Sequence, residues 1–226
     1  MCGRYSLIAE VGQLALRFEF DASGLEQPPR YNVAPTQPVL AVRSGEPRRA
    51  SYMRWGLVPS RAGGAPAGPP LINARAETVA ERGLFRSALT GRRCLVPADG
   101  FYEWKRDGGV RRPVRFTLAS GEPFAFAGLW QTWQDPRGET TASCTIITTE
   151  ANEILRPVHD RMPVILPREL EALWLEEEMQ DATALASLLT PYPSEEMEAY
   201  EVSTLVNSAL NDGPDLIEPV EQGRLL

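Results

Sequence analysis

Arg93-Cys94-Leu95-Val96-Pro97-Ala98-Asp99-Gly100-Phe101-Tyr102-Glu103-Trp104-Lys105 is the stretch of this sequence that decides the fold. Two short runs of mainly apolar and aromatic residues in it predict strands at Arg93–Pro97 and Gly100–Trp104, with a turn at Asp107-Gly108-Gly109. Similar runs predict strands at Pro38–Arg43, Ala50–Trp55, Pro113–Ala119, Phe124–Trp130, Ser143–Thr149 and Met162–Leu166. Because the strands come mainly in hairpin-spaced runs and do not alternate with helices, we expect an α+β fold with a curved antiparallel or mixed sheet.

Helices are expected around this sheet. Apolar residues recur at helical spacing in Ser6–Phe18, which predicts an amphipathic helix that starts just after Tyr5 and offers its free N–H groups to an anion near Cys2. Further helices are predicted from about residue 78 to Leu89 and at Pro167–Leu175, Asp181–Leu189 and Ser203–Leu210. Residues 27–35 are predicted to be extended, and the Gly/Pro-rich stretch 61–70 to form a mobile surface loop. We find no internal repeat or boundary, so we expect one domain over residues 1–226.

Charge is distributed unevenly along the chain. Residues 1–168 carry 22 Lys and Arg against 16 Asp and Glu, whereas residues 169–226 carry 1 against 14, which gives the net charge of −7. This asymmetry suggests an anionic partner such as DNA or RNA for the first part. Nearly all the cations are arginines, which bind phosphate bidentately and stack on bases, although codon usage also explains such a bias. We expect the acidic segment to lie away from a nucleic-acid groove, because its charges would oppose phosphate binding.

The composition also bears on compartment and cofactors. The three cysteines are widely spaced and odd in number, which argues against a disulfide framework and favours a reducing compartment such as the cytoplasm. No segment reaches the roughly 18 apolar residues of a membrane span, so no membrane partner is expected. With a single histidine and no CxxC motif, a zinc site is not expected, and no metal or organic cofactor is implied.

Cys2 stands in the opening sequence Met1-Cys2-Gly3-Arg4-Tyr5. If Met1 is removed, Cys2 carries an amine of pKa about 7.7–8.0 and a thiol of pKa about 8.5 on adjacent carbons. An aldehyde could then condense with the amine to an imine, and thiol attack would close a five-membered thiazolidine ring. The alternative is an ordinary buried cysteine after a start codon.

Four polar residues could orient groups, bind phosphate or transfer protons. Glu103 has aromatic neighbours that could raise its pKa and suit it to acid–base catalysis, or it is a solvent-facing strand residue. His159, the only histidine, could shuttle protons near neutral pH, or be a structural residue. Asn73 and Arg75 share one side of an extended segment; Asn73 could fix a nucleophile and Arg75 a phosphate, whereas the alternative for Asn73 is a helix N-cap.

Two tryptophans are candidate base-stacking residues. Trp55 and Trp104 could stack on bases if their rings are exposed. The alternative is that both belong to the core, where most tryptophan surface is found.

Together these segments resemble one known family. The motif MCGRY is followed in order by YNVAPTQ, RWGLVPS, INARAET, RCLVPADGFYEW, PVHDRMPVIL and VSTLVNSALNDGPDLI. The series runs from Cys2 to about Pro219 and is similar to that of the SOS-response-associated peptidase (SRAP) family, which contains abasic-site processing proteins. The resemblance implies a compact α+β domain with a barrel-like sheet core and a basic groove. We expect a monomer, although the sequence itself does not reveal the oligomeric state.

The resemblance also implies a chemistry. Met1 would be removed, by autoproteolysis or an aminopeptidase, and Cys2 would form a thiazolidine cross-link with the aldehyde of an abasic site in single-stranded DNA or at its junction with duplex. The cross-link would shield the lesion during the DNA damage response, and a DNA lyase-type activity is a further expectation. The implied catalytic residues are Cys2, Asn73, Glu103 and His159, and the implied phosphate contacts are Arg4, Arg75 and Arg161.

One departure from the family pattern follows the WGLVPS motif. Family members usually continue with a tryptophan and a charged residue, whereas this chain continues with Arg61 and a Gly/Pro-rich stretch. A DNA contact made by that tryptophan is therefore in doubt here, and Arg61 could replace it with a phosphate contact.

Three other functions are open at this point. An amidohydrolase with an N-terminal nucleophile also begins Met-Cys-Gly and would release ammonia from glutamine. A general cysteine peptidase would cleave peptides beyond Met1. A non-covalent reader of modified bases would bind DNA without an adduct and would be indifferent to Cys2→Ala.

Overall fold

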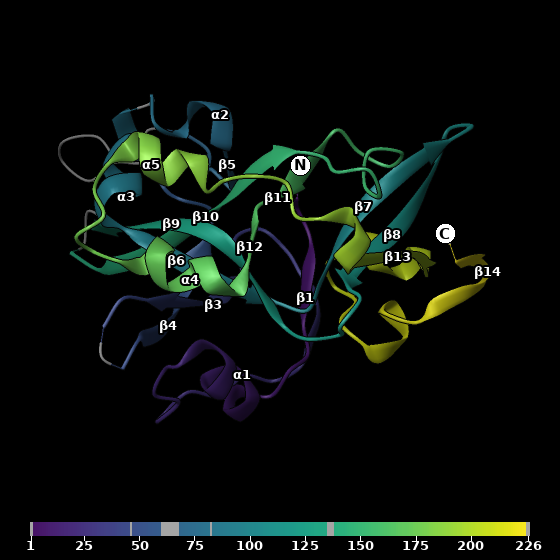
Figure 1. The fold of residues 1–226 in the computed structure, drawn as a ribbon. Helices are drawn as coiled ribbons and strands as arrows, with labels where there is room; N and C mark the ends of the chain where they lie inside the picture. Colours follow the sequence, from purple (N-terminus) through teal and green to yellow (C-terminus); the bar gives the residue numbers. More distant parts are fainter. Residues whose placement is uncertain (1, 46, 60–67, 82, 135–137, 225–226) are drawn as a thin grey trace.

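The computed structural model describes residues 2–45, 47–59, 68–81, 83–134 and 138–224 (Figure 1). Its strands are β1 (Tyr5–Leu7), β2 (Arg30–Val33), β3 (Pro38–Arg43), β4 (Arg49–Trp55), β5 (Asn73–Arg75), β6 (Arg93–Ala98), β7 (Gly100–Asp107), β8 (Val110–Leu118), β9 (Phe124–Gln134), β10 (Thr140–Glu150), β11 (Arg161–Pro163), β12 (Ile165–Leu166), β13 (Met197–Val202) and β14 (Pro219–Arg224). The helices are α1 (Val11–Phe18), α2 (Ala76–Val79), α3 (Gly83–Gly91), α4 (Arg168–Leu175) and α5 (Ala182–Ser187), with short 3-10 turns at Ser194–Glu196, Thr204–Asn207 and Pro214–Leu216. The expected α+β class is confirmed.

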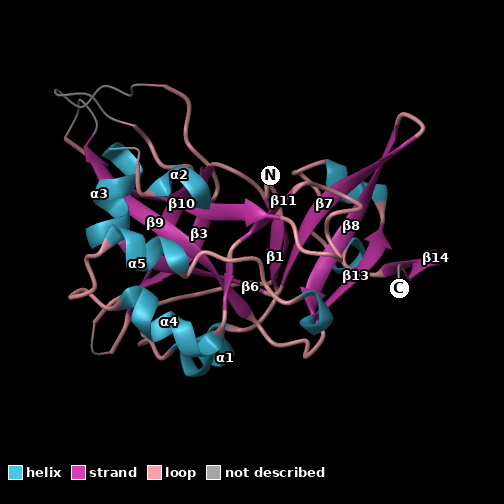
Figure 2. Cartoon of the chain, turned by 45° about the horizontal axis from the view of Figure 1, so that its top comes forward, coloured by secondary structure: helices cyan, strands magenta, loops and turns pink. Residues whose placement is uncertain are grey.

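The larger sheet closes into a barrel. Its strand order is β11-β10-β4-β3-β6-β9-β12, and β9 also pairs with β10, so that β10, β4, β3, β6 and β9 form a ring. Two joins in this ring are short, since β3 pairs with β6 at one position and β4 with β10 at two. Helices α1, α3, α4 and α5 lie outside the ring (Figure 2).

The smaller sheet has the order β14-β13-β8-β7-β1-β2 and places the N-terminal strand between two partners. Tyr5 of β1 lies opposite Val33 of β2 and opposite Phe101 of β7, both antiparallel. Strands β7 and β8 continue beyond the rest of the sheet as a two-stranded hairpin that projects from the body (Figures 1 and 2).

A shared aromatic core joins the two sheets. Tyr5 packs edge-to-face on Trp55 at 5.4 Å and on Phe126 at 5.7 Å between ring centroids. Phe101 stacks on Phe116 at 5.2 Å and meets Phe126 at 6.1 Å. Since Tyr5 and Phe101 belong to one sheet and Trp55 and Phe126 to the other, this packing fixes the first residues of the chain against the barrel.

The predicted helix at Ser6–Phe18 is wrong in its first part. Tyr5, Ser6 and Leu7 form β1 and are all buried, and the helix begins only at Val11. Pairing with β2 and β7 satisfies the backbone of this segment on both edges, and Tyr5 packs on Trp55 and Phe126 of the barrel. Together these contacts outweigh its helical periodicity. The helix N-terminus therefore does not follow Tyr5 directly, and the expected anion site on it near Cys2 is withdrawn.

Other predicted elements need smaller corrections. The helix expected to run to Leu89 is two helices, α2 and α3, and the one at Ser203–Leu210 is a single 3-10 turn. Strands β13 and β14 were not predicted. Most of the predicted 61–70 loop, with Arg61, lies outside the described residues. Within the described part of the chain, no helix is long and apolar enough to cross a membrane.

Candidate active site

Strand β1 carries the start of the chain alongside β7. The pairs Tyr5↔Phe101 and Ser6↔Gly100 are antiparallel, and the Tyr102 N–H donates to the Arg4 carbonyl at 3.0 Å. Extending this register places Gly3 opposite Glu103. The MCGRY and GFYEW motifs are therefore neighbours because their strands pair.

Cys2 lies fully buried at the start of this arrangement. Burial raises the pKa of its thiol far above the ordinary value, and the nearby charge of Glu103 raises it further, while the Arg4 N–H bound to the sulfur lowers it. The thiol is therefore protonated in this environment. A base must take its proton before or during any attack by sulfur.

Asn73 holds Cys2 from the barrel side. Strand β5 pairs in parallel with β10, with Asn73 opposite Ile146, and the Asn73 Nδ2 donates to the Cys2 carbonyl at 2.8 Å. Its Oδ1 is buried and accepts no hydrogen bond from the described residues. The N-cap alternative is excluded, because Arg75 occupies the N-cap position of α2.

Glu103 is a buried carboxyl group. Only 3% of the residue is exposed, although it lies on a strand whose next residues reach solvent, so the solvent-facing alternative is excluded. Desolvation raises the pKa of Glu103 to about 7. A carboxyl group with this pKa exchanges protons in either direction at neutral pH.

His159 lies in the segment between β10 and β11. Its Nδ1 accepts a hydrogen bond from the Arg161 N–H at 2.9 Å, and burial lowers the pKa of the ring. The Asp160 carboxylate is also 2.9 Å from Nδ1, but an ion pair there needs a protonated Nδ1, which could not accept from Arg161. We therefore assign the neutral ring with its proton on Nε2.

A cavity of about 550 Å³ opens Glu103 and His159 to the surface, whereas Cys2 and Asn73 do not line it. Its lining residues are Gly3, Arg4, Glu103, Trp104, Arg106, Arg111, His159 and Asn207. Three of them are arginines and one is a carboxyl group, so the cavity favours an anion. Trp104 is half-exposed here, and its Nε1 donates to the Asn207 Oδ1 at 2.6 Å.

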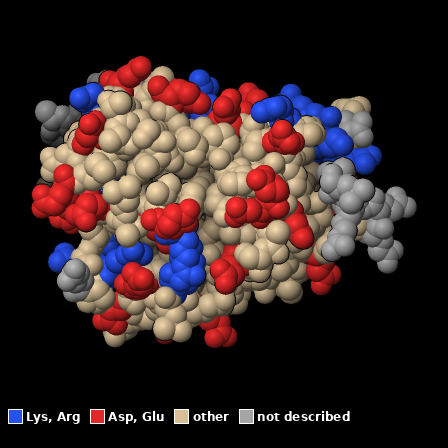
Figure 3. All heavy atoms as spheres, in the orientation of Figure 1, with Lys and Arg blue, Asp and Glu red and all other residues tan. Residues whose placement is uncertain are grey.

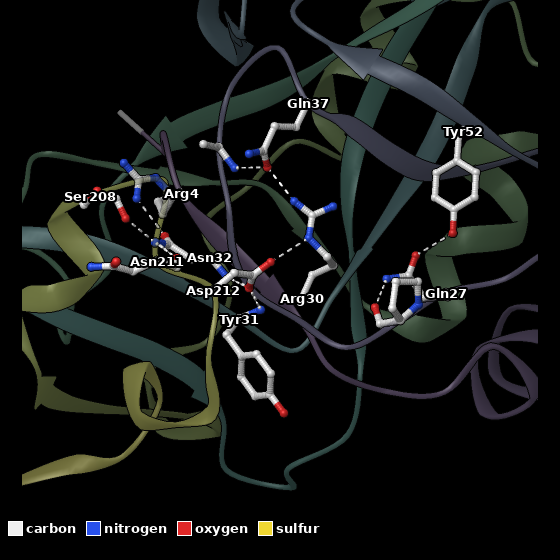
Figure 4. Close-up of polar contacts among 12 residues, drawn as sticks. Arg4, Gln27, Arg30, Tyr31, Asn32, Gln37, Tyr52, Ser208, Asn211 and Asp212 are labelled. Carbon is white, nitrogen blue, oxygen red and sulfur yellow. Dashed lines mark hydrogen bonds and ion pairs between the residues drawn. The ribbon is translucent and has the colours of Figure 1, made fainter.

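Arg4 is held in place by Asn32 and by the segment that contains Val206, Ser208 and Asn211 (Figure 4). Its Nη1 donates to the Asn32 Oδ1 and to the Val206 carbonyl, both at 2.7 Å. Asn32 in turn donates to the Ser208 and Asn211 carbonyls at 2.9 and 2.8 Å. The YNVAPTQ and VNSALND motifs thus meet to hold the N-terminal strand.

The other predicted DNA contacts fall in different environments. Arg75 is exposed, whereas Arg161 pairs with both Glu77 carboxylate oxygens and donates to the Thr148 carbonyl at 2.6 Å. The prediction for Trp55 is wrong: its ring is fully buried against Tyr5, and its Nε1 donates to the Ile72 carbonyl at 2.9 Å. It cannot stack on a base, because it fills the core between the sheets.

Besides Gly3 of the MCGRY motif, three lining residues were missed from the sequence: Arg106, Arg111 and Asn207. Arg106 and Arg111 flank the predicted turn at residues 107–109, and their position on both sides of a hairpin was the signal that could have found them. Asn207 lies far along the chain, in the acidic segment. That segment is therefore not wholly distant from the cavity, although none of its acidic residues lines it.

The sequence that builds this site matches one known family. Residues 1–209 match the SOS response associated peptidase (SRAP) family. The chain belongs to this family. All the residues that line the cavity, from Gly3 to Asn207, lie within the SRAP match.

Several SRAP relatives and structures are similar over nearly the whole chain. Abasic site processing protein YoqW of Bacillus subtilis (strain 168) is 47% identical over 223 residues, covering 96% of this chain and 99% of that protein. Abasic site processing protein YedK of Escherichia coli (strain K12) is 31% identical over 233 residues, covering 97% and 100%. A crystal structure of a protein from Bacteroides thetaiotaomicron superposes with a TM-score of 0.84 at 26% identity, covering 97% of this chain and 100% of that one.

Proposed function

We propose that this protein forms a covalent cross-link between Cys2 and the aldehyde of an abasic site in single-stranded DNA. The observation that carries the proposal is Cys2 held by the Asn73 amide and flanked by Glu103, whose charge acts on the thiol. The cavity beside it combines Glu103 and His159 with three arginines. The names of the relatives YoqW and YedK, abasic site processing proteins, indicate the substrate class.

The proposed reaction begins with hydrolysis of the Met1–Cys2 peptide bond, which frees the amine of Cys2. The closed sugar opens when a base takes the C1′ hydroxyl proton, the bond from C1′ to the ring oxygen breaks, and that oxygen takes up a proton. The amine attacks C1′ and water leaves, giving an imine. The thiol then adds to the same carbon: the C=N double bond becomes a single bond, the thiol proton passes to the base, and the nitrogen takes up a proton. The thiazolidine therefore contains protein plus DNA minus one water.

Glu103 is assigned as the base for sugar opening and for the thiol proton. Its pKa of about 7 permits both proton uptake and release at neutral pH. His159, with Nδ1 engaged by Arg161, is assigned as the donor through Nε2 to the ring oxygen or the leaving hydroxyl. Asn73 orients Cys2, and its buried Oδ1 is a suitable acceptor for the freed amine.

The setting of the reaction is proposed on the same grounds. We place it in the cytoplasm, on single-stranded DNA or a junction with duplex, where the cross-link shields the lesion, and we infer that residues 1–226 act as one monomeric domain without a metal or organic cofactor. A lyase-type cleavage at the same imine stage is a possible side reaction of this chemistry. Peptidase activity is limited to Met1 in this proposal.

The test is the intact mass of purified protein after mixing with single-stranded DNA that carries one abasic site. A species of protein minus Met1 plus DNA minus water, stable to heat and denaturant, is expected. Cys2→Ser is the matched control: it keeps the amine but lacks the thiol, so it should give an adduct only after borohydride reduction of the imine.

A negative result would redirect the assignment. If protein shown to begin at Cys2 gives no adduct, the cross-linking proposal is rejected. Ammonia release from glutamine would then favour the amidohydrolase, and adduct-free binding that persists in Cys2→Ala would favour a modified-base reader.

A further inference from the structure

The β7–β8 hairpin contains two successive cross-strand pairs of positively charged residues. Lys105 lies directly opposite Arg112, and Arg106 lies directly opposite Arg111. Strand β13 pairs with β8 only as far as Val114, so no third strand pairs with this part of the hairpin among the described residues. Figure 3 shows blue atoms gathered at the end of the molecule where this hairpin projects.

Such an arrangement does not serve the stability of the hairpin. Like charges directly opposite each other in an antiparallel pair destabilise it. Arg112 has Glu201 at 3.8 Å on its side of the hairpin. Arg106 and Arg111 are exposed and form no ion pair with any carboxylate among the described residues. Their charge is therefore available to an anion from outside.

The face with Arg106 and Arg111 continues into the candidate active site. Residues two apart on a strand share a face, so Trp104 lies on the same face as Arg106. The Arg111 guanidinium lies 5.7 Å from the centre of the Trp104 ring, and the Arg4 guanidinium lies 5.8 Å from it. Trp104, Arg106 and Arg111 all line the cavity that holds Glu103 and His159.

We propose that this face of the hairpin, formed by Trp104, Arg106 and Arg111, binds the backbone phosphates of the DNA strand next to the abasic nucleotide. The identity of that strand rests on the proposed function. Two guanidinium groups beside an aromatic ring match the chemistry of a single strand, whose phosphates need cations and whose bases stack on aromatic faces. Lys105 and Arg112 lie on the other face of the strand pair, which is that of Glu103, but neither lines the cavity and neither takes part.

The hairpin is also close enough to influence the reacting groups. The charge of Arg111 lowers the pKa of Glu103, against the larger effect of burial. The charge of Arg106 lowers the pKa of His159 in the same direction as burial. A phosphate bound between the arginines would cancel part of both effects, so strand binding and proton transfer are coupled.

The experiment measures binding to a single-stranded oligonucleotide with one tetrahydrofuran abasic analogue, which cannot open to an aldehyde. Affinity is followed by fluorescence anisotropy across a series of NaCl concentrations. Each lost phosphate contact lowers the slope of log K against log salt by about 0.7, so Arg106→Gln/Arg111→Gln should lower it by about 1.4. The matched control, Lys105→Gln/Arg112→Gln, removes the same charge from the opposite face and should keep the wild-type slope.

Two results would overturn the inference. Either Arg106→Gln/Arg111→Gln keeps the wild-type slope, or both double variants lose the same amount, which would mean that only overall charge matters. Thermal unfolding of each variant establishes that it is folded. Since the analogue cannot form a cross-link, failure of the Cys2 chemistry is seen separately, as absence of an adduct between wild-type protein and a natural abasic site.

Discussion

Glu103 connects burial to chemistry at the scale of one residue. With a pKa of about 7, its carboxylate fraction rises as pH rises through neutrality. If it acts as the base, cross-linking by the wild-type protein should speed up over this range. Glu103→Gln should lower the rate on the order of 100-fold and remove the titration near pH 7. Single-turnover rates from about pH 5 to about pH 9 would measure both. An unchanged profile in the variant would assign the base elsewhere.

The same residue should affect stability with a definite sign. The pKa of Glu103 is raised from its ordinary value of 4.5 to about 7. Its protonated form therefore contributes stability that is fully present below about pH 4.5 and is lost as pH rises through 7. The free energy of unfolding lost in this way by alkaline pH is about 3 kcal/mol. Glu103→Gln should therefore unfold at a higher temperature than wild type at pH 8 but not at pH 4, by calorimetry; an equal difference at both pH values would contradict the shift.

Asn73 is a positioning residue rather than a proton donor in this proposal. Asn73→Ala removes the bond from Nδ2 to the Cys2 carbonyl and should cost about 1 kcal/mol of stability. Cross-linking should fall further than stability does, while its pH profile keeps the wild-type midpoint because Glu103 remains. A shifted midpoint would show that Asn73 takes part in proton transfer itself.

At the scale of elements, the register of β1 on β7 depends on Gly100. A Cβ there would lie 2.7 Å from the Arg115 guanidinium, which is held by the Tyr200 hydroxyl at 2.6 Å and by Asp99 at 3.2 Å. Gly100→Ala should therefore cost about 1–3 kcal/mol. It should also slow cross-linking, since this register sets Gly3 opposite Glu103.

A second glycine provides the control for that substitution. Gly12 lies in α1, and a Cβ there meets nothing within 4 Å. Gly12→Ala should stabilise the protein by about 0.5–1 kcal/mol and leave cross-linking unchanged. Chemical denaturation of both variants separates the steric effect at Gly100 from a general response to an added methyl group.

The elements that could be predicted from sequence are those whose local pattern agrees with their burial. Strand β3 was predicted with its observed bounds, and β6 and β7 within a few residues, because apolar runs between turn residues determine them. Strand β1 was missed because its burial comes from β2 and β7, which are distant in sequence. Trp55 was likewise predicted to stack on bases, because its burial comes from Tyr5, which is distant in sequence.

Site residues that lie in family motifs could be predicted from the sequence. Site residues that are brought together by the pairing of strands could not. Cys2, Asn73, Glu103 and His159 were named from motif resemblance, and the structure brings them close together. The contribution of the hairpin was not foreseen. Whether Arg106 and Arg111 share a face with Trp104 depends on the strand register, which no single motif contains.

At the scale of the whole molecule, we expect the position of the charges, more than the net charge, to determine the binding of single-stranded DNA. Glu176, Glu177 and Glu178 line a separate cavity after α4, at the opposite end of the molecule from the β7–β8 hairpin (Figures 1 and 2). Surface charges farther apart than about 10 Å are largely screened at 0.1 M salt. Replacing all three by Gln should leave the salt slope of single-strand binding unchanged. A slope changed as much as in Arg106→Gln/Arg111→Gln would mean that net charge governs binding.

The contact between Arg4 and the Val206 carbonyl has a consequence for the order of events during synthesis. The ribosome makes Cys2 early, whereas Val206 is added 202 residues after Arg4. Until then strand β1 lacks this anchor, although its contacts with Asn73, Trp55 and Phe126 can form as soon as those residues have been made. An enzyme that trims nascent chains therefore meets Met1 before the last of these contacts holds the N-terminal strand.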